Sequence, residues 1–220
     1  MGNVDLDFAL VSPNLTLADV PLDHRVKLGV LASGSGSNYG AIAQAIAEER
    51  LNAEIPVLIY NNPQAKVLER ASKFGTHTQL INHRDFATRE ACDQAILDCL
   101  RSHGVEWVIM AGWMRIVTPV LLQGYADRIL NIHPSLLPSF KGIRAVEQAI
   151  AAQAKITGCT VHYASLEVDS GAIIMQAAVP ILPDDTADSL HARIQVQEHR
   201  IFPPAIALAI HQQASITSTT

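Results

Sequence analysis

Short apolar runs alternate with amphipathic stretches along most of the chain. Residues 28–32, 55–60 and 105–110 are apolar at nearly every position, as in strands that are buried on both faces of a parallel sheet. Between such runs, stretches such as residues 86–103 place apolar side chains at helical spacing. Strands and helices that take turns in this way predict an α/β fold, doubly wound around a mostly parallel sheet.

The same pattern sets the expected elements and their order. About nine residues separate the last two predicted strands, which favours an antiparallel C-terminal strand pair over a parallel crossover. Pro203 and Pro204 should interrupt the last helix. The predicted strands are 28–32, 55–60, 78–81, 105–110, 129–132, 160–163 and 173–181, and the predicted helices begin at 38, 63, 86 and 186.

Length and composition indicate one folded domain. The 220 residues are 49% hydrophobic and 17% charged, which is enough apolar material for a large core and argues against disorder. We expect residues 1–25 to form a loosely ordered extension, residues 26–212 the domain, and residues 213–220 a polar, frayed tail. The net charge of −5 argues against general nucleic-acid binding, since phosphate backbones need a basic surface.

The cysteines and the N-terminus suggest a reducing compartment. The three cysteines are odd in number and lack CxxC spacing, which disfavours a disulfide framework. Neither a membrane span nor a signal-peptide pattern is found. We therefore expect a cytoplasmic protein with no membrane partner, and the sequence leaves open a monomer or a homodimer.

A glycine-serine loop, residues 34–38 (GSGSN), lies between the first predicted strand and helix. Glycines let a backbone approach an anion closely, and a helix N-terminus offers free N–H groups. The loop lacks the spacing of a dinucleotide motif and the lysine of a Walker loop. Two interpretations stay open: a phosphate-binding turn for a small ligand, or a tight turn capped by Asn38.

A second candidate site follows the strand predicted at residues 129–132. Ligands of open α/β sheets bind at the carboxyl ends of strands, and alternation sends Asn131 and His133 to the same side. An amide can donate to an oxygen that becomes negative, and a histidine can supply a proton near neutral pH. These residues suit attack on a carbonyl-type carbon, although a lone histidine at a strand end is more often structural.

Asp169 lies in an Asp-Ser-Gly segment before the last predicted strand. A carboxylate beside a histidine stabilises the charged imidazolium and can hold a proton-relaying water, but the same segment is also a common turn. A serine-protease triad is disfavoured, because Ser135 follows His133 by two residues and no GxSxG elbow occurs. No metal is expected, because the remaining histidines lack ligand spacing and cysteine partners.

Taken together, the segments resemble the phosphoribosylglycinamide formyltransferases, a family of folate-dependent enzymes of purine synthesis. The resemblance runs from residue 27 to residue 210. Its carriers are residues 34–38 (GSGSN), 111–116 (AGWMRI), 130–138 (LNIHPSLLP), 158–162 (GCTVH), 169–171 (DSG) and 195–199 (QVQEH).

The resemblance implies a formyl donor, 10-formyltetrahydrofolate, as co-substrate, and an acceptor, the amine of glycinamide ribonucleotide. The catalytic group falls on Asn131, His133 and Asp169. Acceptor binding falls on Gly36, Ser37, Asn38 and Glu198. Folate binding falls on Arg89, Met114, Arg115, Ile116, Val117 and again Asn131. Neither a metal nor a covalent enzyme intermediate is implied.

Four alternatives compete with this assignment. A methionyl-tRNA formyltransferase would need a further domain and a basic face. A formyltetrahydrofolate hydrolase would need a regulatory domain, which residues 1–25 cannot form. A nucleotide-binding module that is not an enzyme explains the glycine loop but leaves Asn131, His133 and Asp169 without a purpose. A dehydrogenase is disfavoured by the glycine spacing.

Overall fold

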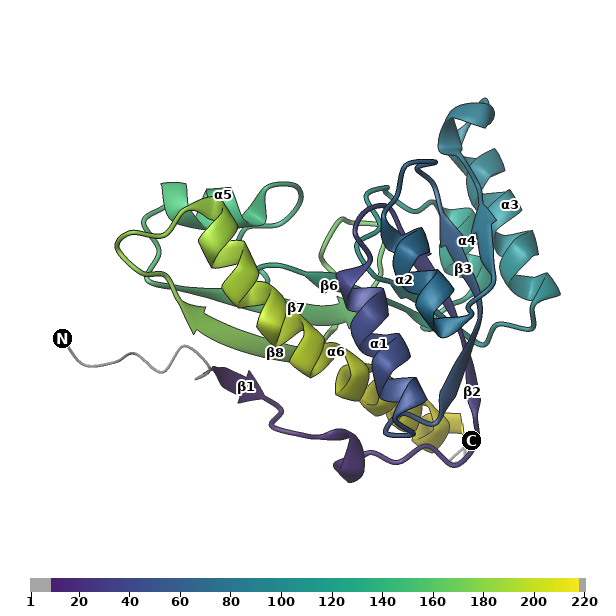
Figure 1. Ribbon diagram of the computed structural model, residues 1–220, viewed down its shortest axis with the longest axis horizontal. Helices are drawn as coiled ribbons and strands as arrows, with labels where there is room; N and C mark the ends of the chain where they lie inside the picture. Colours follow the sequence, from purple (N-terminus) through teal and green to yellow (C-terminus); the bar gives the residue numbers. More distant parts are fainter. Residues whose placement is uncertain (1–8, 218–220) are drawn as a thin grey trace.

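The computed structural model describes residues 9–217 (Figure 1). Its centre is an eight-stranded sheet in the order β1-β8-β7-β6-β5-β2-β3-β4. The strands are β1 (Leu10–Ser12), β2 (Val26–Ala32), β3 (Ala53–Tyr60), β4 (Thr78–Leu80), β5 (Trp107–Met110), β6 (Ile129–His133), β7 (Ile156–Tyr163) and β8 (Ile173–Pro180). The α-helices are α1 (Ser37–Ala47), α2 (Val67–Phe74), α3 (Arg89–Ser102), α4 (Pro119–Gly124), α5 (Ala145–Ala151) and α6 (Ala187–Thr217), with 3-10 turns η1 (Leu17–Asp19) and η2 (His83–Asp85).

The sheet has a parallel part and an antiparallel part. Strands β2 to β6 pair in parallel, whereas β7 runs antiparallel to both β6 and β8. The predicted doubly wound fold, with its mostly parallel sheet and antiparallel C-terminal pair, is therefore confirmed.

The segment before β2 is more ordered than expected where the structure describes it. Residues Leu10–Ser12 form β1, which pairs antiparallel with β8 at one edge of the sheet. Val20 is buried against the main core. A strand this short has no alternation of its own to reveal it, since its conformation comes from pairing with a distant strand. Our expectation for residues 1–8 lies outside the described residues.

The predicted interruption of the last helix is wrong. Helix α6 runs unbroken through Pro203 and Pro204. Proline removes backbone N–H donors and normally kinks a helix, but residues 201–210 are all buried in this fold. Tertiary packing therefore supports α6 where local hydrogen bonds are missing. The helix also continues into the expected tail, as far as Thr217.

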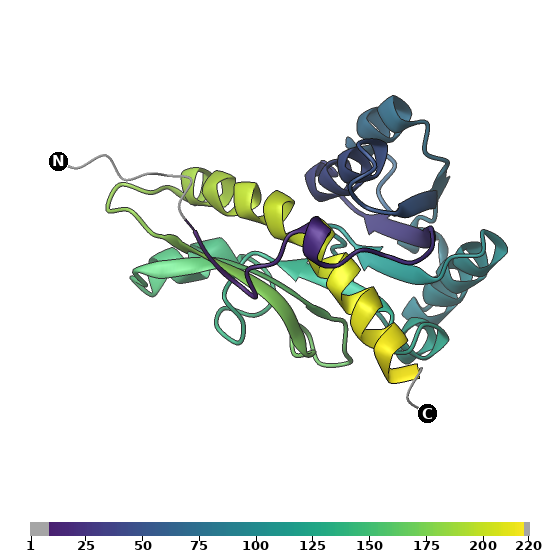
Figure 2. The ribbon, with the colours of Figure 1, turned by 90° about the horizontal axis from the view of Figure 1, so that it is seen from below.

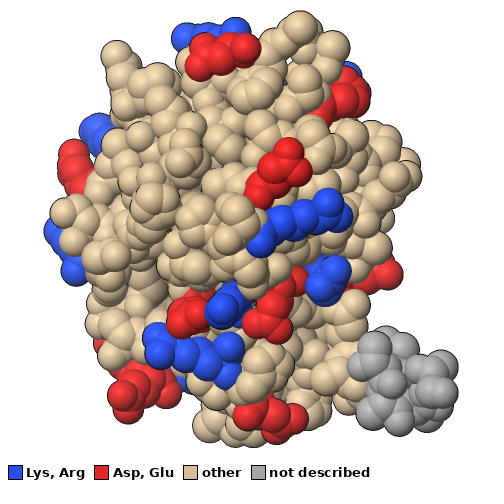
Figure 3. All heavy atoms as spheres, turned by 90° about the vertical axis from the view of Figure 1, so that its right-hand side faces the viewer, with Lys and Arg blue, Asp and Glu red and all other residues tan. Residues whose placement is uncertain are grey.

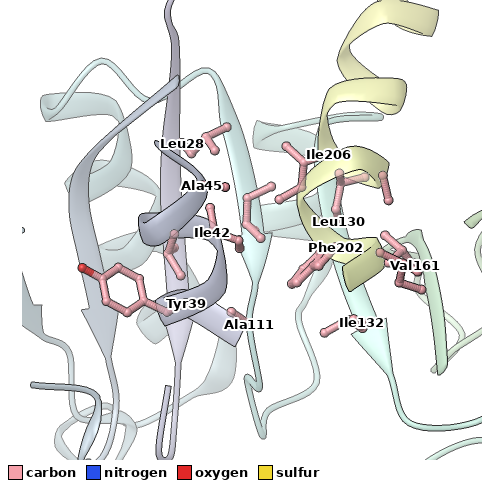
Figure 4. Packing of buried hydrophobic residues seen from close by; sticks show 14 of the residues in the cluster. Leu28, Tyr39, Ile42, Ala45, Ala111, Leu130, Ile132, Val161, Phe202 and Ile206 are labelled. Carbon is pink, nitrogen blue, oxygen red and sulfur yellow. The ribbon is translucent and has the colours of Figure 1, made fainter. Parts of the chain in front are cut away.

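Helices cover both faces of the sheet (Figures 1 and 2). Helices α1 and α6 pack on one face, where Phe202 and Ile206 of α6 lie near Leu130 of β6 (Figure 4). Helices α3 and α4 pack on the other face, in a second buried cluster that includes Leu121. Burial on both faces explains the near-continuous apolar runs in the sequence.

The described surface carries charges of both signs, and the described helices show no membrane-spanning character. Figure 3 shows acidic and basic side chains intermixed on the face that it presents. Within residues 9–217, no helix is both long and apolar enough to cross a bilayer.

A buried ion pair anchors the start of α6. Arg193 donates to both carboxylate oxygens of Asp185, at 2.7 and 2.9 Å, and only 11% and 4% of the two side chains are exposed. These bonds, with those from Leu182 N–H and Ser189, outweigh burial and lower the pKa of Asp185 to about 2. The carboxylate is therefore more stable in the folded chain than in the unfolded one.

We expect Arg193→Gln to lower the free energy of unfolding at pH 6 by about 1–2 kcal/mol, less than the full equivalent of the depressed pKa because the bonds from Leu182 N–H and Ser189 remain. The pair stabilises the fold above the unfolded pKa of Asp185, 3.8, and this contribution is lost as the pH falls towards about 2. The difference between variant and parent should thus shrink steadily below about pH 4, in urea unfolding followed by circular dichroism. Arg200→Gln, at an exposed position of the same helix, is the control. A difference that stays constant with pH contradicts this account.

Candidate active site

Asn131 and His133 lie on β6, at the carboxyl end of the parallel part of the sheet. Strand alternation sends both side chains to one side, whereas Ile132 between them packs into the core with α6. His133 is 5% exposed and Asn131 is half-buried. The strand therefore presents an amide and an imidazole next to each other at a sheltered edge.

Asp169 reaches the same place from the loop between β7 and β8. Its Oδ2 atom lies 3.3 Å from His133 Nδ1, and Asn131 Nδ2 lies 3.4 Å from its Oδ1 atom. The chain leaves β7 beside Leu130, and the loop that follows folds back over β6 to bring Asp169 to His133. The structure thus brings together the three residues predicted as catalytic.

The carboxyl group of Asp169 is held in its charged form. Burial alone would raise its pKa, but the interaction with His162, the Gly142 N–H hydrogen bond and the charge of His133 outweigh that effect. The pKa of Asp169 is therefore lowered from its ordinary value. At neutral pH the group is an anion beside two imidazoles.

The backbone of residues 140–142 completes this cluster. His133 Nε2 lies 2.8 Å from the carbonyl oxygen of Phe140, and Gly142 N–H donates to Asp169 Oδ2 at 2.8 Å. A carbonyl oxygen only accepts, so Nε2 of His133 carries a hydrogen. The Nδ1 contact with the Asp169 anion is then favourable when Nδ1 is protonated too, that is, when His133 is an imidazolium.

His162 is a member of the cluster that sequence reasoning did not assign to the site. Its Nε2 atom lies 3.1 Å from Asn131 Nδ2 and 3.6 Å from Asp169 Oδ1. Its Nδ1 atom lies 2.9 Å from the carbonyl oxygen of Tyr163. The side chain is 2% exposed. His162 lies directly opposite Asn131 in the pairing of β6 with β7. Alternation along β7 could have placed its side chain on the same side of the sheet as that of Asn131.

A pocket of about 310 Å³ opens over these residues. Its walls come from residues 112–117, 131–134, 142–145 and 162–169. Met114, Arg115, Ile116 and Val117, which were predicted to bind folate, all line it, together with Asn131. Met114 and Ile116 are 78% and 52% exposed, so apolar surface is available to a flat ring system.

Arg89 lies apart from the other predicted folate residues. It is the first residue of α3 and lines a neighbouring hollow, which it shares with Arg115 and Ile116. The structure therefore places Arg89 beside the main pocket and not within it.

The glycine loop forms a separate cradle next to this pocket. Ser37 Oγ accepts a hydrogen bond from Gln195 Nε2 at 2.9 Å, and Asn38 Nδ2 donates to Glu198 Oε2 at 2.9 Å. The predicted acceptor residues Ser37, Asn38 and Glu198 are thus brought together between the start of α1 and α6. Gln195 belongs with them, although our sequence analysis assigned it no role.

Glu198 is a buried carboxyl group. Burial raises its pKa, while the hydrogen bond from Asn38 and the charge of His191 act in the opposite direction. The Oδ1 atom of Asn38 is buried and receives no hydrogen bond from the described residues. The cradle therefore contains a buried acceptor oxygen whose hydrogen bond is not made within the described residues.

Two hydrogen bonds join the cradle to the pocket. Ser33 N–H donates to the carbonyl oxygen of Gly112 at 3.1 Å, and Met114 N–H donates to Ser33 Oγ at 2.9 Å. Strands β2 and β6 both border β5, so the two binding regions lie along one edge of the sheet.

Other chemistries find less support in the described residues. Ser135 is fully buried and its Oγ donates to the Ser139 carbonyl oxygen at 2.6 Å, which leaves it unsuited to act as a nucleophile. Among residues 9–217, no group of three or more His, Cys, Asp or Glu side chains is arranged to hold a metal ion.

The chain is similar to known formyltransferases. The model of the formyl transferase family matches residues 26–206. A phosphoribosylglycinamide formyltransferase of Bacillus subtilis is 43% identical over 82% of this chain and 92% of its own length. A trifunctional purine biosynthetic protein of Drosophila melanogaster is 41% identical over 88% of this chain, which spans only 14% of that protein.

Solved structures agree with these matches. A glycinamide ribonucleotide transformylase of Symbiobacterium toebii superposes with a TM-score of 0.83 at 43% identity, over 84% of this chain and 88% of that one. A phosphoribosylglycinamide formyltransferase of Bacillus halodurans gives 0.79 at 40% identity, over 83% and 93%.

The glycine loop generates a prediction about stability. Gly36 has φ +69°, and a Cβ there would lie 2.2 Å from Val67 Cγ2. We expect Gly36→Ala to lower the free energy of unfolding by about 1–3 kcal/mol, because it adds backbone strain to overpacking. At Gly34 an added Cβ meets nothing within 4 Å, so Gly34→Ala should change it by less than about 0.5 kcal/mol. Equal losses in urea unfolding would show that the loop does not need a glycine at position 36.

Proposed function

Because the chain belongs to the formyl transferase family, and within it to the phosphoribosylglycinamide formyltransferases, we propose that it transfers the formyl group of 10-formyltetrahydrofolate to the amine of N1-(5-phospho-D-ribosyl)glycinamide. The products are the N-formyl ribonucleotide and tetrahydrofolate, in the purine pathway that leads to IMP. The observation that carries the proposal is the convergence of Asn131, His133 and Asp169 at one pocket beside an anion cradle.

The reaction proceeds by direct attack. The acceptor's amine nitrogen forms a bond to the formyl carbon, and the formyl oxygen takes up the negative charge of a tetrahedral intermediate. The bond from that carbon to N10 of the folate then breaks, and the proton lost by the amine ends on N10. No covalent enzyme intermediate is needed.

Asn131 and His133 stabilise the oxyanion. Both side chains line the pocket, and a preorganised donor and a cation are most effective where water is excluded. The amide nitrogen of Asn131 has two partners, His162 Nε2 at 3.1 Å and Asp169 Oδ1 at 3.4 Å, so donation to the oxyanion takes the hydrogen of the longer contact. Donation from His133 Nε2 requires the Phe140 carbonyl oxygen, 2.8 Å away, to give up that hydrogen.

Asp169 pairs with His133 and relays the proton. Its own lowered pKa keeps it an anion at neutral pH, and its Oδ2 atom faces His133 Nδ1. An anion at this distance stabilises positive charge that develops on the imidazole during the reaction. The Gly142 N–H bond orients the carboxylate at the same time.

The two binding regions divide the substrates between them. The cradle of Gly36, Ser37 and Asn38 takes the acceptor's phosphate at the N-terminus of α1, and Glu198 accepts from its ribose hydroxyls. The pocket walls Met114, Arg115, Ile116 and Val117 take the folate, and Arg89 in the adjoining hollow takes its glutamate carboxylates. This placement sets the amine and the formyl carbon next to each other.

The proposal extends to the setting of the enzyme. Residues 26–212 form the formyltransferase domain, which works in the cytoplasm as a monomer or a homodimer without a metal, nucleic acid or membrane partner. The net charge of −5 favours a small-molecule acceptor over tRNA.

We predict that purified protein forms tetrahydrofolate from 10-formyltetrahydrofolate only when glycinamide ribonucleotide is present, because the acceptor's amine is the nucleophile. Absorbance of the released folate measures the rate. Omitting the acceptor, or replacing it with glycinamide lacking the ribose phosphate, should reduce turnover to background. Equal turnover without acceptor would instead identify a hydrolase.

We predict that His133→Ala and Asp169→Ala each lower kcat by about 10²–10⁴-fold, the range for a lost oxyanion stabiliser or proton relay. Their circular dichroism spectra should match that of the parent. His77→Ala, at an exposed histidine outside the pocket, is the matched control. An Asp169→Ala protein with the full rate between about pH 6 and pH 9 would rule out the proton relay.

A further inference from the structure

Asp93 is a buried carboxylate that the reaction itself does not use. It lies on α3 with 1% of its side chain exposed, and it does not line the pocket. A buried charge is costly unless it is paired and hydrogen-bonded. The residues that pair with Asp93 therefore indicate its structural role.

One partner of Asp93, Arg115, lines the pocket, and the other, Thr118, directly follows the wall segment in the chain. Asp93 Oδ2 accepts from Thr118 N–H at 2.6 Å, and its Oδ1 atom lies 3.7 Å from Arg115 Nη1. The same nitrogen of Arg115 contacts Sγ of the adjacent Cys92 at 2.9 Å. Only 10% of the Arg115 side chain is exposed, so α3 holds most of it.

Packing fixes two residues of this wall, because Trp113 and Val117 are buried in the second core cluster, and the residues between them depend on polar contacts. Residues 113–118 form no helix or strand, and Met114 and Ile116 point outward on either side of Arg115. At the N-terminal side of this segment, Met114 N–H is bound by Ser33 Oγ. At the C-terminal side, Asp93 holds both Arg115 and Thr118. A segment without its own hydrogen-bond ladder takes its shape from such anchors.

We propose that Asp93 is a positioning residue for the folate pocket: it fixes residues 114–118 and orients the Arg115 guanidinium towards the donor. This proposal rests on the function proposed above. Asp93 acts through Arg115, so it governs donor binding more than the chemical step and does not govern acceptor binding.

Asp93→Asn tests the charge while retaining an oxygen that accepts from Thr118 N–H. We expect the Kd for tetrahydrofolate, measured by isothermal titration calorimetry, and the KM for 10-formyltetrahydrofolate both to rise about tenfold, the loss typical of a charge-assisted contact. The kcat and the acceptor's KM should stay within about twofold. Asp98→Asn, at an exposed position of the same helix, should change none of these values.

Combining the change with Arg115→Ala tests the route of action. If Asp93 acts through Arg115, Asp93→Asn should have no further effect on the Kd for tetrahydrofolate once Arg115 is removed. A tenfold rise in both backgrounds overturns the proposal, and so does a uniform fall in kcat with an unchanged Kd.

Cys92→Ala gives a milder second variant, should Asp93→Asn fold poorly. It removes the Sγ contact with Arg115 Nη1 and leaves the Asp93 carboxylate in place, and we expect a two- to threefold rise in the same Kd, about the size of one weak contact. An unchanged Kd would contradict anchoring of Arg115 by α3. A parent protein that binds no tetrahydrofolate would instead refute the proposed function.

Discussion

The contact between His133 Nδ1 and Asp169 Oδ2, at 3.3 Å, is the interaction on which the site depends. It joins two segments that are 36 positions apart. Strand β7 runs antiparallel to β6, with Thr160 opposite His133 and Tyr163 opposite Leu130, so β7 ends beside the start of β6. Asp169 reaches His133 because the loop between β7 and β8 folds back over β6. The antiparallel strand itself contributes His162, which lies opposite Asn131, to the same cluster.

Features encoded locally were accessible from the sequence. The buried apolar runs predicted the α/β sheet, and period-two alternation predicted that Asn131 and His133 share a side. Resemblance to a family, and not physical reasoning, joined Asp169 to them. Features set by distant partners were missed or misjudged. Strand β1 forms only by pairing with β8, and α6 stays unbroken because it packs in the core around Phe202. The role of Asp93 can be inferred only from its contacts in the folded chain.

The glycine loop shows how one residue can satisfy two requirements. Gly36 has φ +69° and lies against Val67, so packing alone excludes a side chain there. The same turn begins α1 at Gly36 without a side-chain cap for the N–H groups there, which suits an anion. The structural and the ligand-binding interpretations of this loop are therefore compatible, and the hydrogen bonds from Gln195 to Ser37 and from Asn38 to Glu198 distinguish it from an ordinary turn.

The cluster of Asn131, His133 and Asp169 takes two of its contacts from main-chain atoms of residues 140–142. A carbonyl oxygen and an amide hydrogen are common to almost all amino acids, so exchanging Phe140 for another residue that tolerates its φ of 55° leaves the contact with His133 in place. Position 142 is more restricted, because proline there would remove the hydrogen that Asp169 accepts and φ is +78°. Related chains can thus drift in sequence along this loop while their chemistry stays the same, and an alignment would underrate the loop's importance.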